Sequence, residues 1–189
     1  MSDDVRIRHV SDGDWGDIVT LESSAYAAIG LSEERAALES RVRVSPTTCF
    51  VLEFEQRLSG YLLALPYPMF EYPDLDRTEE ITFRSRNLHL HDVVIAEDLR
   101  GRGLAKRLLH HLTATARSQE YEQISLVAVA GSETFWSANG FTVHQGVVPA
   151  GSYGATPVYM SRAVPADRTD DPKPTSGLLR GQSSLDEVG

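Results

Sequence analysis

The sequence lacks most of the features that mark a secreted, membrane-embedded or nucleic-acid-binding protein. Its 189 residues include a single cysteine, Cys49, which excludes an internal disulfide and a zinc site built from several cysteines. No apolar run approaches the ~18 residues of a membrane helix, and residues 1–10 lack the apolar core of a signal peptide. The net charge of −9 argues against general nucleic-acid binding, which needs a basic face. We expect a cytoplasmic protein with neither a nucleic-acid nor a membrane partner.

Composition divides the chain into a domain and a tail. Hydrophobic residues make up 41% of the sequence, enough for a single domain with a buried core. Residues 165–189 are instead rich in proline, glycine, serine and charge, and they show no sustained periodicity. Such a segment cannot bury enough apolar surface to offset the entropy of ordering it. We expect a domain over residues 1–164 and a flexible tail over residues 165–189.

Hydrophobic periodicity in residues 1–164 predicts an α+β fold. A first strand (5–10) precedes two helices (12–26 and 31–42), with Asp12 and Ser32 as the expected N-caps. A hairpin follows, with strands at 48–55 and 59–65. The remaining expected elements are a strand (88–95), a helix (103–118), a strand (124–129), a short helix (132–139) and strands near 141–145 and 156–161. Residues 66–86 are too long for a simple connection, so we expect a lid, a binding loop or disorder there.

The stretch "HLHDVVIAEDLRGRGLAKRLL", residues 89–109, combines imidazoles with a glycine-rich basic turn. Alternation along a strand places His89 and His91 on one face, and Leu88, Leu90 and Val94 on the other. Histidine is suited to accepting a proton near neutral pH. The alternative is a pair of structural histidines, and a metal site is disfavoured because no third ligand stands in an obvious place.

The turn that follows predicts a site for an anionic ligand. Gly101 and Gly103 permit close approach of the backbone to a ligand, and a long amphipathic helix begins directly after them. Unpaired N–H groups at a helix N-terminus bind phosphate, and the turn also carries cations, namely Arg100, Arg102, Lys106 and Arg107. A basic, solvated helix start is the alternative. Neither a nucleotide P-loop nor a dinucleotide fingerprint fits the spacing, so we favour another diphosphate.

The spacing Arg-x-x-Gly-x-Ala, met as Arg100, Gly103 and Ala105, resembles the acyl-CoA pyrophosphate loop of the GNAT superfamily of N-acetyltransferases. The segment "SETFWSANGFTV", residues 132–143, is similar to the helix and Gly-Phe pair of the same family. The resemblance spans residues 5–161. It implies the GNAT-type fold, a central mixed, mostly antiparallel sheet flanked by helices, with acetyl-CoA as co-substrate and no metal.

A second resemblance concerns arylalkylamine (serotonin-type) N-acetyltransferases, in which His-Leu-His precedes the same strand and loop. It implies that His89 and His91 deprotonate the amine through ordered water, with direct acetyl transfer in a ternary complex. It also implies that backbone groups of residues 93–95 hold the pantetheine and polarise the thioester, and that residues 101–106 cradle the pyrophosphate. The expected cofactor-binding residues are Val93, Val94, Ile95, Arg100, Gly101, Arg102, Gly103, Leu104, Ala105, Lys106 and Trp136.

Two residues depart from simple expectation. Trp136 stands where many GNAT members carry a tyrosine that protonates the CoA thiolate, and an indole N–H is no useful acid. Either Tyr153 or Ser137 serves instead, or the thiolate leaves unassisted, and Trp136 packs against the cofactor or the sheet. Asp92 alternates onto the leucine face of its strand, where a buried carboxylate needs a partner.

The acceptor is the least determined part of the sequence. Residues 66–80 combine three aromatic side chains with five acidic ones, which suits a cationic amine with an apolar body, although a solvated acidic loop has the same composition. We expect a small-molecule primary amine. The alternatives are a protein amine, a different acyl-CoA, or a non-catalytic module that only binds acyl-CoA. A homodimer is one possible assembly.

Overall fold

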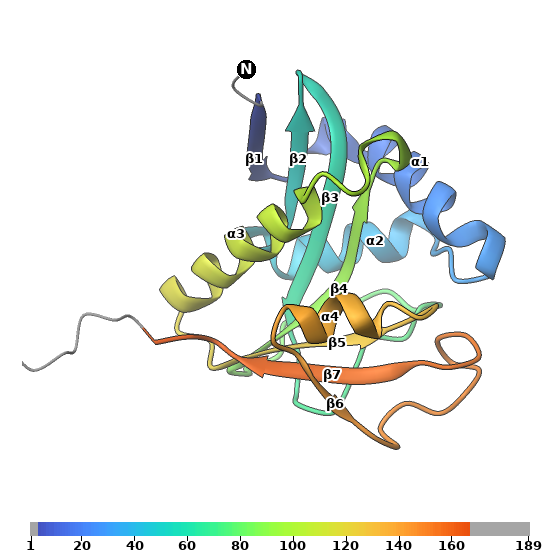
Figure 1. The fold of residues 1–189 in the computed structure, drawn as a ribbon, viewed down its shortest axis with the longest axis vertical. Coiled ribbons are helices and arrows are strands. Elements are labelled where there is room, and N and C mark those ends of the chain that lie inside the picture. The colour runs from blue at the N-terminus through green and yellow to red at the C-terminus, as the bar shows by residue number, and fades with distance from the viewer. Residues whose placement is uncertain (1–3, 167–189) are drawn as a thin grey trace, which may run out of the picture.

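A seven-stranded sheet runs through the part of the chain that the computed structural model describes, residues 4–166 (Figure 1). The strand order is β1-β2-β3-β4-β5-β7-β6, and β4–β5 is the parallel pair in an otherwise antiparallel sheet. This confirms the expected α+β class and mixed sheet. The strands are β1 (Val5–His9), β2 (Phe50–Phe54), β3 (Arg57–Pro66), β4 (Asn87–Ile95), β5 (Gln123–Ala128), β6 (Thr142–His144) and β7 (Val158–Ala163).

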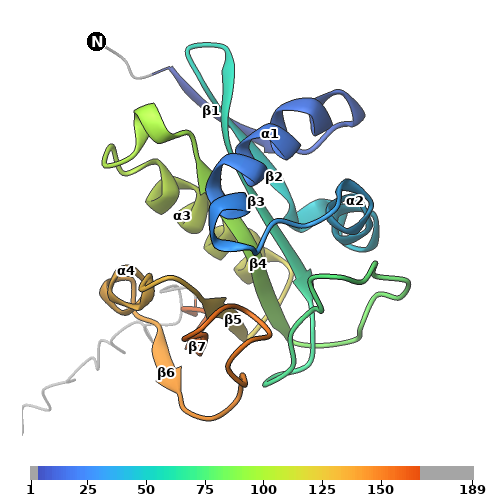
Figure 2. The same ribbon diagram turned by 90° about the vertical axis from the view of Figure 1, so that its right-hand side faces the viewer.

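Helices cover both faces of the sheet (Figure 2). On one face lie α1 (Trp15–Tyr26) and α2 (Arg35–Val44), which pack on a cluster that includes Leu63 and Val94. The other face carries α3 (Leu104–Ser118) and α4 (Glu133–Ala138), whose Leu108 and Trp136 belong to the larger core. Short 3-10 turns lie at 12–14, 27–29, 46–48 and 97–99. No helix within residues 4–166 combines the length and apolarity needed to cross a membrane.

Several local expectations are corrected by the contacts that the side chains make. Asp12 does not cap α1, because Asp14 accepts the Ser11 N–H at 2.8 Å and a 3-10 turn precedes the helix. Ser32 does not cap α2, because its hydroxyl donates to Glu22 at 2.6 Å and the helix starts at Arg35. Cys49 is fully buried, and burial raises the pKa of its thiol to about 12, as suits a core side chain.

A bulge in β4 changes which face its residues occupy. Leu63 lies opposite Asp92 and Ala64 opposite Leu90, so His91 is an extra residue in the ladder. Asp92 and Val94 therefore leave the face of Leu88 and Leu90, and the expected alternation was wrong for both. Val94 packs with α1 and α2, whereas Leu88 and Leu90 pack with α3.

The same strand separates from its parallel neighbour soon after their pairing begins. Only residues 87–89 of β4 pair with residues 123–125 of β5. Beyond them the two halves of the sheet diverge at a steep angle, which Figure 1 shows in the directions of β4 and β5. The backbone of β4 from His91 onward is thus left without a partner on the β5 side, and a ligand can bind there.

Residues 67–86 form a long irregular connection, which the side chains of the core hold in place. The guanidinium of Arg41 on α2 donates to the carbonyls of Asp74 at 3.0 Å and Arg77 at 3.4 Å. The Tyr67 ring packs edge-on against Phe83, with 4.6 Å between centroids. This segment is therefore part of the fold. The expected tail, residues 165–189, lies outside the described residues apart from its first two.

We predict that Asp14→Asn lowers the free energy of unfolding by about 1–2 kcal/mol at pH 7. Hydrogen bonds from Arg8, at 2.7 and 2.8 Å, lower the pKa of the Asp14 carboxyl to about 2. This stabilisation is complete above the unfolded-state pKa of about 3.9 and is lost as the pH falls through about 2. Urea denaturation from pH 2 to 7 measures it, with the exposed Asp12→Asn as the control. A difference between wild type and Asp14→Asn that is independent of pH would contradict the assignment.

Candidate active site

A cavity of about 440 Å³ lies where β4 and β5 diverge, between α1, α4 and the start of α3. Six of the residues expected in the site line this cavity, namely His91, Val93, Ile95, Arg100, Ala105 and Trp136. The cavity is bounded on one side by the unpaired backbone of the β4 bulge. It is therefore an elongated site with exposed main-chain groups on one wall and the α3 N-terminus at one end.

The loop before α3 has the backbone that its glycines predict. Gly101 and Gly103 adopt φ angles of +79° and +76°, and a β-carbon on either would meet no other atom within 4 Å. Both are exposed, so a ligand can approach their main-chain atoms directly. Gly103 precedes the 15-residue helix α3, whose first N–H groups have no partner within the helix. The loop can therefore hold an anion.

The remaining residues expected to bind the cofactor do not all face the main cavity. Arg102 lies over the Phe54 ring at 5.6 Å, beside a separate surface hollow. Leu104 is buried in the core, and the Val94 side chain packs against the opposite face of the sheet. Lys106 is exposed on the first turn of α3. Arg100 lines the cavity, and its Nε donates to the Ile95 carbonyl at 3.3 Å.

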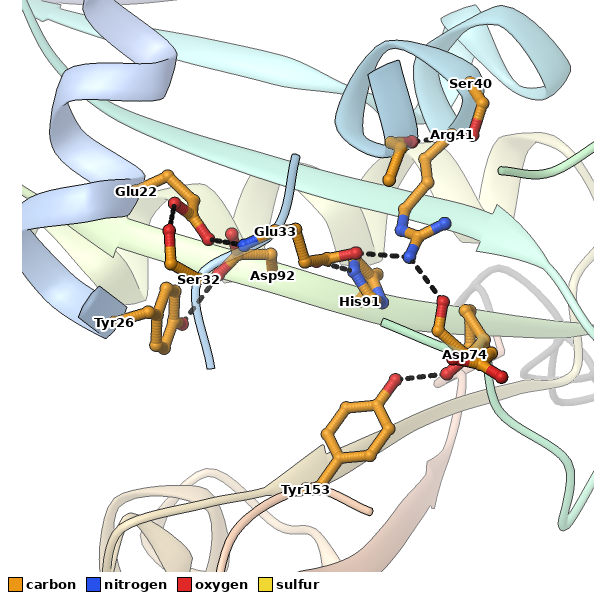
Figure 3. Close-up of polar contacts among 12 residues, drawn as sticks. Glu22, Tyr26, Ser32, Glu33, Ser40, Arg41, Asp74, His91, Asp92 and Tyr153 are labelled. Atoms are coloured by element: carbon orange, nitrogen blue, oxygen red, sulfur yellow. Dashed lines mark hydrogen bonds and ion pairs between the residues drawn. The ribbon is translucent and has the colours of Figure 1, made fainter. Parts of the chain in front are cut away.

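His91 is the imidazole at the centre of a buried chain of charges (Figure 3). Its Nε2 lies 2.5 Å from Glu33 Oε2, and the other oxygen of Glu33 accepts a hydrogen bond from Arg41. Desolvation raises the pKa of the Glu33 carboxyl, but His91 and Arg41 outweigh it, so that pKa lies below its usual range. Glu33 is therefore an ionised acceptor, and it holds His91 in one orientation.

This contact fixes which nitrogen of His91 can act as a base. A carboxylate only accepts, so the ring N–H belongs on Nε2 and the lone pair on Nδ1. Within residues 4–166, Nδ1 has no hydrogen-bond partner. Burial, the largest effect, lowers the pKa of the ring below 6.5 despite Glu33, so His91 is neutral at pH 7. A neutral imidazole with a free lone pair can accept a proton.

His89 has a different environment, because the bulge separates it from His91. Its Nδ1 lies 3.0 Å from the Ser125 hydroxyl, and its ring lies near the rings of Tyr67 and Tyr159. The residue is 1% exposed, and burial lowers its pKa well below 6.5. His89 does not line the 440 Å³ cavity, whereas His91 does. The structure therefore brings only one of the two residues to that wall, and the imidazole of His91 is itself buried, with 1% of its side chain exposed.

Asp92, the second residue of the bulge, has the partners that its burial demands. The hydroxyl of Tyr26 at the end of α1 donates to Oδ1 at 2.6 Å, and the hydroxyl of Tyr61 on β3 donates to Oδ2. Burial raises the pKa of this carboxyl to about 7, against the lowering effect of both hydrogen bonds. The carboxyl group can therefore exist in either protonation state at neutral pH.

Two further cavities adjoin the first on the side of the 67–86 connection. A small one of about 50 Å³ shares Tyr26, His91 and Asp92 with the main cavity and is also lined by Glu33 and Tyr153. Beyond it, a larger one of about 710 Å³ is lined by both aromatic and acidic side chains, namely Tyr67, Phe70, Tyr72, Tyr153, Glu71, Asp74 and Asp76. The bulge thus lies between an elongated cavity and an aromatic, acidic one.

Neither Tyr153 nor Ser137, the two residues considered as acids, lines the main cavity. Trp136 is 6% exposed and packs edge-on against Phe135 and Phe141, while also lining the main cavity. Tyr153 donates its hydroxyl to the Pro73 carbonyl, which ties its loop to the 67–86 connection. Ser137 is exposed and does not line the main cavity.

The sequence did not reveal Glu33, Arg41 or Tyr26 as site residues, nor Tyr61 as a core partner of Asp92. Glu33 lies in a charged helix start, "SEERAALESR", which reads as an ordinary solvated segment. Its partner His91 is 58 residues away, and Tyr26 is 66 residues from Asp92. The one available signal was Asp92, a carboxylate in an apolar strand that required a partner.

Comparison with known proteins agrees with this geometry. A model of the acetyltransferase (GNAT) family matches residues 15–141, and no curated protein sequence matches the chain. Ard1 from Thermoplasma volcanium superposes with a TM-score of 0.66 and 15% identity, over 85% of this chain and 97% of that one. The GphF GNAT-like decarboxylase in complex with isobutyryl-CoA superposes with a TM-score of 0.65 and 20% identity, over 85% of this chain and 100% of that one. For the ribosomal-protein-S18-alanine N-acetyltransferase from Escherichia coli, the TM-score is 0.62 and the identity 13%, over 88% of this chain and 97% of that one.

At these identities, the solved structures establish a shared fold. The family match covers most of the chain and includes the β4 bulge, the Gly101–Gly103 loop and the helix that carries Trp136. The mixed, mostly antiparallel sheet flanked by helices is the one that the first resemblance implied. The chain belongs to the GNAT family of acetyltransferases.

Proposed function

We propose that the protein is an acetyl-CoA-dependent N-acetyltransferase that acts on a small cationic primary amine by direct transfer in a ternary complex. The observation that carries this proposal is the meeting of two cavities at the β4 bulge. His91, held by Glu33, lines both the main cavity and the small one that leads to the acidic cavity. A base at this position would lie between the cofactor and the acceptor.

Acetyl-CoA fits the main cavity in one direction. The pyrophosphate would lie at the Gly101–Gly103 loop and Arg100, with backbone N–H groups and a guanidinium as partners. The pantetheine would pair with the unpartnered backbone of β4 near Val93, beside Ile95 and Trp136. The thioester would then reach the bulge, where main-chain donors can stabilise an oxyanion. Within residues 4–166 no group of three or more metal ligands occurs, and this chemistry requires none.

The acceptor cavity favours a cation with an apolar body. Its walls combine carboxylates with phenol and phenyl rings, which together attract an ammonium group by charge and cation–π contact. An ammonium with a pKa near 10 must lose a proton before it can attack. The Nδ1 lone pair of His91 accepts that proton, and Glu33 stabilises the resulting imidazolium.

A peptide or protein amine is the second candidate acceptor. One of the structural neighbours is named for acetylating a ribosomal-protein alanine, which makes peptide N-termini worth testing on this fold. An acyl group other than acetyl and a non-catalytic acyl-CoA-binding role complete the alternatives.

A panel assay tests the proposed function directly. The purified protein is given acetyl-CoA, propionyl-CoA or isobutyryl-CoA with arylalkylamines, polyamines, amino acids or peptides that have free N-termini. We expect CoA-thiol release with acetyl-CoA and cationic arylalkylamines or polyamines. Release with peptides alone would replace the small-amine assignment. Tight acetyl-CoA binding without turnover for any acceptor would favour the binding-module alternative.

We predict that Gly103→Val weakens acetyl-CoA binding by on the order of 100-fold. A β-branched residue disfavours the +76° φ angle, and its methyl groups would occupy the approach to the loop. The matched control is Gly146→Val, because Gly146 has a similar φ of +72° with open space around it but lies in the connection between β6 and β7, outside the loop before α3. Calorimetry on both folded variants measures the affinity. Equal losses for the two variants would show that backbone strain alone is responsible.

We predict that His91→Gln lowers kcat/KM by about 100-fold or more, whereas His89→Gln costs less than about tenfold. A neutral imidazole is needed as base, so wild-type activity should fall as the pH drops through the pKa of His91, which burial places below 6.5. The His91→Gln variant should lack this acidic limb, and His89→Gln should keep it. A pH–rate profile at saturating acetyl-CoA measures both. The reverse order of effects would transfer the base role to His89.

A further inference from the structure

Asp92 is a buried carboxyl group with no cation beside it. It is 5% exposed, and its hydrogen bonds come from the hydroxyls of Tyr26 and Tyr61. No ion pair to Asp92 exists within the described residues 4–166, although Arg41 neutralises the nearby Glu33. Burying a carboxylate without a cation is costly, and such groups concentrate at functional sites.

The two tyrosines differ in their access to the cavities. Tyr26 is half-buried and lines both the main cavity and the small one, as Asp92 does. Tyr61 is fully buried in the core between the sheet and the first two helices, and it lines neither cavity. Figure 3 shows Tyr26, at the end of α1, close to Asp92, which lies on the same strand as His91. Tyr26 is therefore the one member of the pair that lines a cavity in which a ligand can bind.

The family position for an acid that protonates the CoA thiolate does not supply one here. The position that carries a tyrosine in many relatives is Trp136, whose indole N–H does not give up its proton near neutral pH. The Tyr153 hydroxyl is engaged with the Pro73 carbonyl and does not line the main cavity. Tyr26 is the tyrosine that lines the main cavity.

We propose that Tyr26 is the acid that protonates the departing CoA thiolate, and that Asp92 is the carboxyl group that replaces the proton which Tyr26 loses. This inference rests on the acetyl transfer proposed above. It assigns protonation of the thiolate to a tyrosine on α1 beside the β4 bulge. In relatives that carry a tyrosine at the position of Trp136, the tyrosine of that later helix has this role.

The proton transfers balance as follows. After the amine attacks, the tetrahedral intermediate carries a positively charged nitrogen, and Asp92 accepts one proton from it. The C–S bond then breaks with its electron pair on sulfur, and the Tyr26 hydroxyl gives its proton to that sulfur. Asp92 returns its proton to the Tyr26 oxygen. Counted from the free amine, the net result is an amide and a CoA thiol, with one proton moved from nitrogen to sulfur. The proton that His91 took from the ammonium passes to water, and the enzyme is then unchanged.

The surroundings of Asp92 suit this exchange. Burial raises its pKa to about 7, the two tyrosine hydroxyls lower it, and the carboxyl groups of Glu33 and Glu22 raise it. Glu33 comes from the segment before α2 and Glu22 from α1. Burial, and after it the charge of Asp92, raises the pKa of the Tyr26 hydroxyl, so this group is protonated at neutral pH and has a proton to give.

The first test compares Tyr26→Phe with Tyr61→Phe. Each variant removes one hydroxyl and one hydrogen bond to Asp92, so Tyr61→Phe reproduces the structural consequence without touching the cavity. We expect Tyr26→Phe to lower kcat by about 100-fold with an unchanged Kd for acetyl-CoA, and Tyr61→Phe to change kcat by less than about fivefold. Equal losses in the two variants would make the tyrosine pair structural and would overturn the proposal.

The second test follows the pH dependence of kcat. Asp92 must be ionised to accept a proton, so wild-type kcat should rise with pH through about 7. Asp92→Asn should remove this limb while the circular dichroism spectrum stays native. His91→Gln should keep it, because the pKa of His91 lies below 6.5. A limb near 7 that survives in Asp92→Asn would contradict the role of Asp92.

These outcomes separate the two proposals. If the wild-type protein binds acetyl-CoA but acetylates no amine in the panel, the proposed function and this inference both fail. If the wild-type protein is active, and both Tyr26→Phe and Asp92→Asn keep its activity and its pH profile, only this inference fails.

Discussion

The guanidinium of Arg41 is the charge on which the candidate site depends. Its side chain is completely buried, and it pairs with Glu33 and, at 3.5 Å, with Glu79. It also donates to two carbonyls of the 67–86 connection. Removing one partner of such a group leaves uncompensated buried charge, which is far more costly than losing a surface pair. Together with His91, this cation keeps Glu33 ionised, and it also holds part of the wall of the 710 Å³ cavity in place.

The second constraint is the extra residue in β4. A regular strand would point His91 and Asp92 to opposite faces, whereas the bulge turns both toward α1 and the segment before α2. The parallel pairing with β5 ends at residue 89, just before the bulge. The ionisable side chains of His91 and Asp92 and the unpaired main chain of β4 therefore occur at the same place. The bulge and the early end of the β4–β5 pairing together create the candidate site within the sheet.

Sequence reasoning found the parts of this site that local pattern encodes. The strand, the loop and the helix over residues 88–118 follow from apolar periodicity, and the left-handed backbone at Gly101 and Gly103 follows from residue type. Alternation failed at Asp92 and Val94, because no local signal announces a bulge. Arg41 was missed because a single arginine within a charged helix gives no sign of burial. Its partners are fixed only by tertiary packing.

The walls of the two cavities come from different stretches of the chain. Every residue that lines the main cavity lies within the family-matched residues 15–141. The acceptor cavity also uses residues 147 and 151–153, in the connection between β6 and β7 that follows the match. Substitutions in that connection can therefore reshape the second cavity without changing any residue that lines the main one.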